Sequence, residues 1–428
     1  MIDFKEVKKV YFLGIGGIGV SAIARMFLHE GMEVCGSDTA ESEITTELMN
    51  EGALIFIGQD ISHIPEDADL VIYTIAIEKF APDFLNEVRK KIKNVISYPE
   101  TLSIISKNKY TIAICGTHGK TTTTAMVAKI MIDAGLDPTV IVGSILNDVH
   151  SNFIAGKSKY LVVEACEYCR SFLEINPTVV GITTIDNDHM DYYKDEEDIL
   201  SAFAEFTDKA TEIVVGNVKN DKIQKVVGNK KSIDSDDFFD KNLRLKIPGE
   251  HNRRNASVAL AIAEFLGVPK NSAIASLENF SGTWRRFEYK GKTNSGAIVY
   301  DDYAHHPAEI KATLLGAREL YPEKEITIVF QPHLYSRTKI FLDDFAEVLS
   351  KADHIIITDI YAAREENDNS ISGKILTDKI TQENKNTLFI SDFKDIALEL
   401  QKNASEKDII IIMGAGDISQ LPEILLSK

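Results

Sequence analysis

The stretch YTIAICGTHGKTTTTAMVAKIM (residues 110–131) joins a continuous apolar run to a helical pattern through a glycine-rich turn. Such a run, followed at once by a helix, is typical of a strand in a parallel sheet that is covered on both faces. The turn holds Gly116, Gly119, Lys120 and Thr121. Backbone N–H groups, a lysine and a hydroxyl can together hold nucleotide phosphates and Mg²⁺. The stretch therefore predicts an α/β fold with a phosphate loop at a strand end.

This loop is shorter than the standard phosphate-binding pattern. That pattern has a glycine five residues before its second glycine, and Ile114 stands there in this chain. The sequence retains a compact form, G-T-H-G-K-T-T, at residues 116–122. A glycine turn without function would leave the adjacent lysine and threonines unexplained, so we favour a nucleotide site.

Apolar runs followed by a polar or glycine turn and a helical pattern recur along the whole chain. Ten such runs are too many for one doubly wound sheet, so we predict three α/β domains, 1–106, 107–295 and 296–428. The breaks fall near ISKNKY (105–110) and after FSGTWRRFEYKGKTNSG (280–296). The runs are residues 10–17, 53–58, 70–76, 110–117, 160–165, 179–185, 212–217, 325–332, 354–360 and 408–416.

Composition narrows the class of protein. The 428 residues carry a net charge of −18, which argues against binding a nucleic-acid backbone. The chain has no run of about 18 apolar residues, so we expect no membrane span, and its start does not read as a signal peptide. Four cysteines in a chain of this length do not make a disulfide framework. We therefore expect a cytoplasmic protein.

The segment GIGGIG (14–19) has the G-x-G-x-x-G spacing of a nucleotide-diphosphate site. Gly14, Gly16 and Gly19 follow a strand and open a helix, and Asp38 ends the next strand. Glycines let the backbone approach a diphosphate, and the helix N-terminus supplies oriented N–H groups. The alternatives are a plain tight turn and, because of Asp38, the site of a nicotinamide-dependent dehydrogenase. The latter leaves Lys120 unexplained.

Two further segments follow strands of the predicted central domain, EACEYCRSF (164–172) and DNDHMDYY (186–193). Ligands gather at the carboxyl ends of parallel strands, so Glu164 and His189 should lie near Lys120 and Thr121. Carboxylate, hydroxyl and imidazole groups around phosphates suit Mg²⁺ better than zinc. A capping or core role is the alternative for His189.

Histidine, tyrosine and arginine also gather at helix starts and strand ends in the second half. His251, Asn252 and Asn255 open a helix, where plain capping is an equally good interpretation. The segments YDDYAHHPAEI (300–310) and FQPHLYSRTKIF (330–341) both follow strands. Their histidines and Arg337 suit recognition of a carboxylate or phosphate.

Eight motifs in order resemble those of the Mur ligase family. They run from about residue 8 to residue 418 and are GIGGIGVSAIA, GTHGKTTTT, EACEYCRSFL, DNDHMDYY, GEHNRRN, RRFEYKG, DDYAHHPAEI and FQPHLYSRT. The resemblance implies a Rossmann-like N-terminal domain for a UDP-sugar, a P-loop ATPase-like central domain for ATP and Mg²⁺, and a Rossmann-like C-terminal domain for an amino acid. It is strongest toward the members that join L-alanine to UDP-N-acetylmuramate, through an acyl phosphate, in peptidoglycan precursor synthesis.

The resemblance also implies roles for individual residues. Lys120 would neutralise the transferring phosphoryl group, Thr121 and Glu164 would bind one Mg²⁺, and His189 a second. The remaining ATP contacts would be Gly116, Thr117, His118, Gly119, Thr122, His251, Asn252, Asn255, Arg286 and Asp302. The UDP-sugar would meet Gly14, Gly16, Gly17, Gly19 and Asp38, and the amino-acid end would meet Tyr303, His305, His306, His333 and Arg337.

The chain departs from the family pattern at several positions. Leu334 replaces a frequent arginine, and Thr183-Thr184-Ile185 replaces the usual T-N-I. We place no carbamylated lysine. Acidic residues often stand where Cys166 and Cys169 stand here, so this CxxC pair more plausibly replaces two oxygens than forms a zinc or redox site.

Competing functions are the dehydrogenase, a recycling ligase that attaches a preformed tripeptide, and a pure binding module. We expect a monomer or homodimer. The sequence leaves open the choice of alanine over serine or glycine, and any feedback control.

Overall fold

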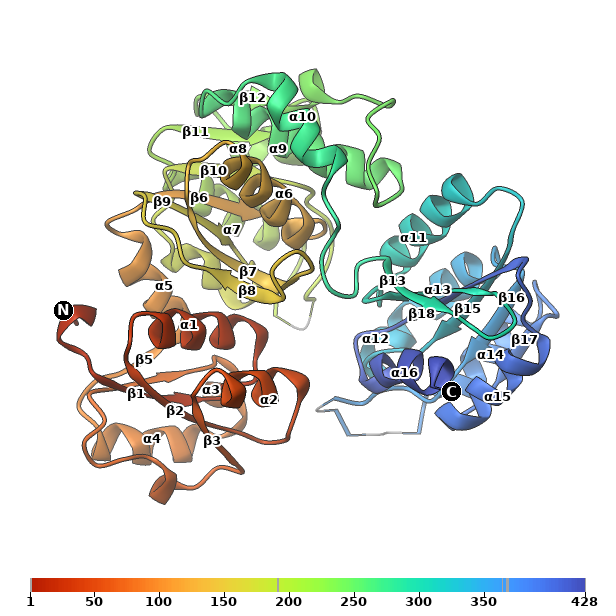
Figure 1. Cartoon of the computed structure of the whole chain (residues 1–428), viewed down its shortest axis with the longest axis horizontal. Helices are drawn as coiled ribbons and strands as arrows, with labels where there is room; N and C mark the ends of the chain where they lie inside the picture. The colour runs from red at the N-terminus through yellow and green to blue at the C-terminus, as the bar shows by residue number, and fades with distance from the viewer. Residues whose placement is uncertain (1, 191, 364, 367–368, 428) are drawn as a thin grey trace. The chain divides into compact units, whose positions relative to one another are not determined.

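The computed structural model describes residues 2–190, 192–363, 365–366 and 369–427. The chain divides into two compact units. The first comprises Met1–Arg244 with Arg253–Phe280, and the second comprises Leu245–Asn252 with Ser281–Lys428. The first unit holds two β-sheets and the second holds one (Figure 1).

The N-terminal sheet is parallel throughout, in the order β3-β2-β1-β4-β5. Alternate residues of β1 face opposite ways: Val10 and Phe12 pack in one core with α1, and Tyr11 and Leu13 pack in another with α4. Helices therefore cover both faces of this sheet (Figure 1). Its elements are β1 (Lys9–Leu13), α1 (Ile18–His29), β2 (Glu33–Asp38), α2 (Glu43–Asn50), β3 (Leu54–Ile57), β4 (Leu70–Tyr73), α3 (Ala76–Phe80), α4 (Pro82–Lys91), β5 (Val95–Ser97) and α5 (Tyr98–Ser106), with short 3-10 helices η1 (Phe4–Glu6) and η2 (Ile61–His63).

The central sheet has the order β12-β11-β10-β6-β9-β7-β8, and only the pair β7–β8 is antiparallel. The middle strands β6 and β10 are almost entirely apolar and buried, which is the pattern of strands covered on both faces. Its elements are β6 (Tyr110–Cys115), α6 (Lys120–Asp133), β7 (Thr139–Leu146), β8 (Ser151–Ile154), β9 (Tyr160–Glu164), η3 (Tyr168–Glu174), β10 (Val179–Ile182), α7 (Glu196–Asp208), β11 (Ile213–Gly216), α8 (Asp221–Val227), β12 (Ser232–Asp234) and η4 (Ser235–Phe238), followed by α9 (Glu250–Phe265) and α10 (Lys270–Glu278).

The sheet of the second unit has the order β13-β14-β18-β15-β16-β17, and only β13 runs antiparallel to its neighbour. Ile328 and Phe330 face a core with α11 and α13, while Val329 faces one with α15 and α16. The elements are β13 (Glu288–Lys292), β14 (Ile298–Asp302), α11 (Pro307–Leu320), β15 (Glu325–Phe330), α12 (Tyr335–Ile340), α13 (Leu342–Leu349), β16 (His354–Ile357), α14 (Gly373–Ile380), β17 (Thr387–Phe389), α15 (Phe393–Asn403), β18 (Asp408–Met413), η5 (Asp417–Gln420) and α16 (Leu421–Leu426).

The predicted α/β class with parallel sheets is confirmed. The third sheet starts earlier than the predicted boundary at residue 296, because β13 (Glu288–Lys292) pairs with β14. The search for apolar runs did not find β13, because this strand (EYKGK) is polar and lies at the edge of the sheet. Within the described ranges, no helix is long and apolar enough to cross a membrane.

A buried polar network joins the two sheets of the first unit. Arg25 of α1 donates from Nη1 to Oδ1 of Asn152 on β8, over 2.6 Å. The Asn152 amide in turn donates to the backbone oxygen of Ile18 and to the Ser21 hydroxyl. Arg25 also donates from Nε to Glu51 and from Nη2 to Glu47. These bonds tie the helix that follows the glycine turn to the outer hairpin of the central sheet.

Candidate active site

Three neighbouring parallel strands of the central sheet, β10, β6 and β9, end at one edge. The phosphate loop follows β6, Glu164 ends β9, and the segment leading to His189 follows β10. The loop is bound to the last of these segments, since Thr117 N–H donates to the Thr184 carbonyl and Thr183 Oγ1 donates to the His118 carbonyl. The strand order thus brings together residues that are far apart in sequence.

Both glycines of the phosphate loop meet requirements that no larger residue satisfies. Gly116 has φ +135°, and a Cβ there would lie 2.0 Å from Thr183 Oγ1. Gly119 has φ +85°, and a Cβ there would lie 2.3 Å from Asn255 Oδ1. Gly119 is the N-cap of α6 and provides no side-chain cap to its first turn. The helix N-terminus is therefore open to an anion, as a phosphate site requires.

Lys120 is held at the centre of this edge. Its ammonium donates to the carbonyls of Gly116 and Thr117, over 2.6 and 3.0 Å, and lies 2.9 and 2.8 Å from Oε1 and Oε2 of Glu167. Burial is the largest single effect and lowers the pKa of Lys120, but the charges of Glu167, Cys166 and Glu164 and the hydrogen bond to Glu167 together raise that pKa above its ordinary value. The side chain is thus a fixed positive charge next to the helix N-terminus.

Glu167 is a central residue that the sequence interpretation passed over. It is 2% exposed, and its Oε1 lies 3.7 Å from Nε2 of His189. The Tyr193 hydroxyl donates to its backbone oxygen over 2.6 Å. The sequence offered one indication of its role: EACEYCRS contains two glutamates, but only Glu164 was predicted to belong to the site. The structure pairs Lys120 and His189 with the second one.

Glu164 lies against the neighbouring strand β7. Its Oε2 accepts a hydrogen bond from the Gly143 N–H over 2.8 Å. A Cβ on Gly143 would come within 2.6 Å of both carboxylate oxygens, so the glycine is required for this position. In the part of the chain that the structure describes, Oε1 of Glu164 has no hydrogen-bond partner. Thr121, the second residue of α6, is buried beside the same loop.

The CxxC segment has neither the geometry of a disulfide nor that of a zinc site. All four cysteines are free thiols; Cys166 is exposed and Cys169 is partly exposed. Cys169 and Arg170 both have left-handed backbone angles, with φ of 52° and 56°. Among residues 2–190, 192–363, 365–366 and 369–427, no group of three or more His, Cys, Asp or Glu side chains is arranged to hold a metal ion.

The residues of the helix-start motif at α9, His251, Asn252 and Asn255, have two different roles. Asn255 lies against Gly119 of the phosphate loop. Asn252 donates from its amide to the Pro248 carbonyl over 2.7 Å, and the His251 ring lies against Gly249, which has φ +101°. Asn252 and His251 thus form the turn that starts the helix, and only Asn255 is placed by these contacts at the phosphate loop.

The N-terminal glycine turn has the form that the sequence predicted. Gly14 has φ +75°, and Gly17 is the N-cap of α1 without a side-chain cap. Asp38 Oδ2 accepts the Gly16 N–H over 2.8 Å. The Asp38 carboxylate therefore fixes the turn itself, which gives it a structural role that does not depend on a ribose.

The second unit gathers aromatic, basic and acidic side chains beyond the ends of β14 and β15. Arg285 and Arg286 both place their guanidinium groups 5.3 Å from the Tyr303 ring centre. His305 Nδ1–H donates to the Tyr303 carbonyl over 2.9 Å, and Nδ1 lies 3.4 Å from Oε2 of Glu309. Burial, the largest effect, lowers the pKa of His305. The imidazole is thus favoured in its neutral form.

His333 and Arg337 extend this cluster. The His305 and His333 ring centres are 5.9 Å apart, and His333 stacks on Tyr361. Arg337 Nη1 lies 3.3 Å from His333 Nδ1. Leu334, between them, has φ +70° and ψ 134°, a strained backbone for a residue with a side chain. Strain of this kind is concentrated at functional sites.

Asp302 and His306 flank the cluster and are both buried. Asp302 accepts backbone N–H groups of Phe287 and Ala304, and burial raises its pKa to about 6. His306 caps α11 by accepting the Ala308 N–H, and its ring packs against Phe341. The contacts of His306 are those of a capping residue. Those of Tyr303, His305, His333 and Arg337 form one group.

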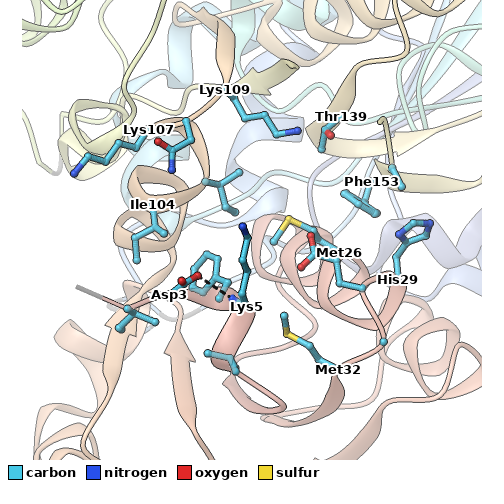
Figure 2. Close-up of a pocket in the computed structure, with 18 of the residues that line it drawn as sticks. Asp3, Lys5, Met26, His29, Met32, Ile104, Lys107, Lys109, Thr139 and Phe153 are labelled. Carbon is cyan, nitrogen blue, oxygen red and sulfur yellow. Dashed lines mark hydrogen bonds between the residues drawn. The ribbon is translucent and has the colours of Figure 1, made fainter. Parts of the chain in front are cut away.

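A cavity of about 1350 Å³ lies elsewhere in the first unit (Figure 2). Residues of α1 such as Met26 and His29 line it together with Lys107 and Lys109, beyond the end of α5, and Phe153 of β8. It includes none of the residues that the sequence singled out, so the predicted chemistry does not depend on it.

Three family models match this chain. Their descriptions are "Mur ligase family, catalytic domain" over residues 9–110, "Mur ligase middle domain" over 114–263, and "Mur ligase, glutamate ligase domain" over 285–416. A relative from Agathobacter rectalis, named UDP-N-acetylmuramate–L-alanine ligase, is 39% identical and covers 100% of this chain and 99% of the relative. A relative of the same name from Caldicellulosiruptor bescii is 41% identical, with 99% of both chains covered.

A solved structure agrees with these matches. The UDP-N-acetylmuramate-alanine ligase of Thermotoga maritima superposes with a TM-score of 0.82 and 28% sequence identity. The superposition covers 97% of this chain and 98% of that one.

Proposed function

Because this chain belongs to the Mur ligase family, we propose that it joins L-alanine to the carboxylate of UDP-N-acetylmuramate at the expense of ATP. The observation that carries the proposal is the meeting of the phosphate loop, Lys120, Glu164 and Glu167 at one edge of the central sheet. Such an edge is built for phosphoryl transfer by positioning and charge neutralisation. The product would be a peptidoglycan precursor, made in the cytoplasm where ATP is available.

The reaction proceeds in two steps. An oxygen of the muramyl carboxylate attacks the γ-phosphorus of ATP, the bond to ADP breaks, and an acyl phosphate forms. The alanine amine then attacks the acyl carbon, loses a proton, and expels inorganic phosphate to leave an amide. Lys120 lies at the N-terminus of α6, where it neutralises the negative charge of the transferring group.

The donor groups at this edge fit Mg²⁺. The Glu164 carboxylate, which the Gly143 N–H orients, and the Thr121 hydroxyl in the first turn of α6 are hard oxygen ligands. His189 lies nearby beside Glu167. The metal, when bound, would offset phosphate charge. Thr121 and Glu164 would hold one Mg²⁺, and His189 a second.

We assign the other substrates to the remaining clusters of side chains. The glycine turn at Gly14–Gly19 would bind the diphosphate of the UDP-sugar, since it offers an uncapped helix N-terminus. In the second unit, Arg337 would bind the alanine carboxylate as a bidentate donor, with Tyr303, His305 and His333 around it. Asn255, beside Gly119, would contact the bound nucleotide.

The test is phosphate release by the pure full-length chain with ATP, Mg²⁺ and UDP-N-acetylmuramate. Alanine, serine, glycine and a preformed tripeptide are offered one at a time. We expect release with alanine above all. Release with the tripeptide alone would instead identify the recycling ligase, and no release with any of them would reject the proposal.

A further inference from the structure

Tyr98 occupies a position that neither the motifs nor the proposed chemistry explains. It directly follows β5 and opens α5, so it lies at the carboxyl edge of the N-terminal sheet, as the glycine turn does. Ser97 and Glu100 form a capping box around this helix start, with Ser97 N–H donating to Glu100 Oε2 over 2.7 Å. The box and Pro99 fix the backbone from which the tyrosine projects.

The phenol of Tyr98 covers the first turn of α1. A Cβ on Gly19 would lie 2.8 Å from Cζ and 2.9 Å from Oη of Tyr98. Gly19 is the third glycine of the G-x-G-x-x-G turn, where the diphosphate is expected. The hydroxyl group thus reaches the edge of the predicted diphosphate site.

Tyr98 is also close to the reacting end of the site. Its helix, α5, packs against η3, which begins within the EACEYCRS segment. Burial, and after it the charges of Glu164 and Cys166, raise the pKa of Tyr98. The phenol therefore keeps its proton and is a donor at neutral pH.

We propose that the Tyr98 hydroxyl donates a hydrogen bond to the sugar portion of the UDP-sugar and so positions its carboxylate at the phosphate loop. This inference rests on the proposed function. The substrate would run from the diphosphate at Gly19 to a carboxylate near Glu164. Tyr98 lies against Gly19 at the first end, and its helix packs against η3 near the second. The part of the substrate between these ends is an acylated sugar, which carries carbonyl and hydroxyl acceptors.

The experiment compares binding of UDP and of UDP-N-acetylmuramate, without ATP, to the full-length chain and to Tyr98→Phe. The variant keeps the ring against Gly19 and removes only the hydroxyl. Tyr160→Phe is the matched control, because Tyr160 begins β9 at the opposite end of the strand from Glu164. Calorimetry gives the affinities, and steady-state kinetics give kcat and KM for each substrate.

We expect Tyr98→Phe to weaken UDP-N-acetylmuramate about tenfold, as the loss of one hydrogen bond predicts, and to leave UDP affinity unchanged. KM for the UDP-sugar should rise while KM for ATP stays constant, and Tyr160→Phe should change neither. Equal weakening of both ligands, or no change in either, would overturn the inference. Binding is measured without turnover, so a failure of the proposed ligase activity would be visible separately as absent phosphate release in the unmodified chain.

Discussion

The ammonium of Lys120 lies within 2.9 Å of both carboxylate oxygens of Glu167. The phosphate-loop lysine is therefore held, even without nucleotide, by the buried carboxylate of Glu167, which lies just after the neighbouring strand β9. This pairing orients Lys120 and compensates its charge beside the buried Glu167 carboxylate. It also means that the lysine and Glu167 act as one unit, so that a change in either affects both.

We predict that Lys120→Ala lowers phosphate release about 100- to 1000-fold, the usual cost of removing one preorganised electrostatic group. It also leaves the Glu167 charge buried without its partner, so the variant should lose stability. Calorimetry should show that UDP-N-acetylmuramate still binds, because the glycine turn lies in another sheet. Lys129→Ala is the control, since Lys129 is on the same helix and pairs with Asp133. Turnover that survives in Lys120→Ala would show that the loop has another role.

A methyl group on Gly143 should move the Glu164 carboxylate, which lies 2.6 Å from where that group would be. We expect Gly143→Ala to raise the Mg²⁺ concentration for half-maximal turnover about 10- to 100-fold, as loss of a group that orients a metal ligand does. Turnover is measured across a Mg²⁺ titration, with UDP-N-acetylmuramate binding as the control for folding. An unchanged titration midpoint would remove Glu164 from the metal site.

The double variant Cys166→Ser and Cys169→Ser should keep its activity. Both thiols are free, and neither belongs to a metal-binding cluster in the described part of the chain. Phosphate release and zinc content are measured together in the variant and the unmodified protein. A large loss of activity, or bound zinc that disappears in the variant, would restore the cysteine interpretation of EACEYCRS.

The pH dependence of stability should include a contribution from Asp302. Burial raises its pKa from 3.8 to about 6, so the folded chain holds this proton more tightly than the unfolded chain. The contribution is therefore fully present below pH 4 and is lost as the pH rises through about 6. It amounts to about 2 to 3 kcal/mol in the free energy of unfolding.

Asp302→Asn lacks this titration, so the stability of the unmodified protein relative to the variant should fall between pH 4 and pH 7. Denaturant unfolding at several pH values measures the difference. Asp344→Asn, at an exposed aspartate, is the control and should show no such trend. A constant difference between Asp302→Asn and the unmodified chain would mean that Asp302 titrates normally.

The junction between the first two sheets should depend on Asn152. Asn152→Ala removes the acceptor of Arg25 Nη1 and two donated bonds to α1, of which the bonds to Arg25 and Ser21 are buried and the bond to the Ile18 carbonyl is partly buried. We expect a loss of about 1 to 3 kcal/mol in the free energy of unfolding. Asn176→Ala is the comparison, because the exposed Asn176 amide also joins elements of the two sheets, to the Ser103 carbonyl. Equal losses in both variants would show that burial of the Asn152 network adds nothing.

Much of the fold could be predicted from local pattern. The apolar runs at β6, β9, β10, β15 and β18 and the helix at α11 follow from periodicity, because a strand covered on both faces must be apolar throughout. The polar edge strand β13 could not be predicted in this way, because it has no continuous apolar run. The phosphate loop and the glycine turn were predictable because glycine spacing encodes backbone shape directly.

By itself, the sequence determined the α/β class, the phosphate loop and the residue types gathered at strand ends. Only the tertiary structure decided which of those residues meet. With the strand order β10-β6-β9-β7, Glu167 pairs with Lys120 and Glu164 accepts a hydrogen bond from Gly143. The packing of α9 brings Asn255 against Gly119. Local patterns report burial and backbone conformation within a few residues. Pairings between side chains depend on strand order and on which neighbour lacks a Cβ, and these are set by long-range packing.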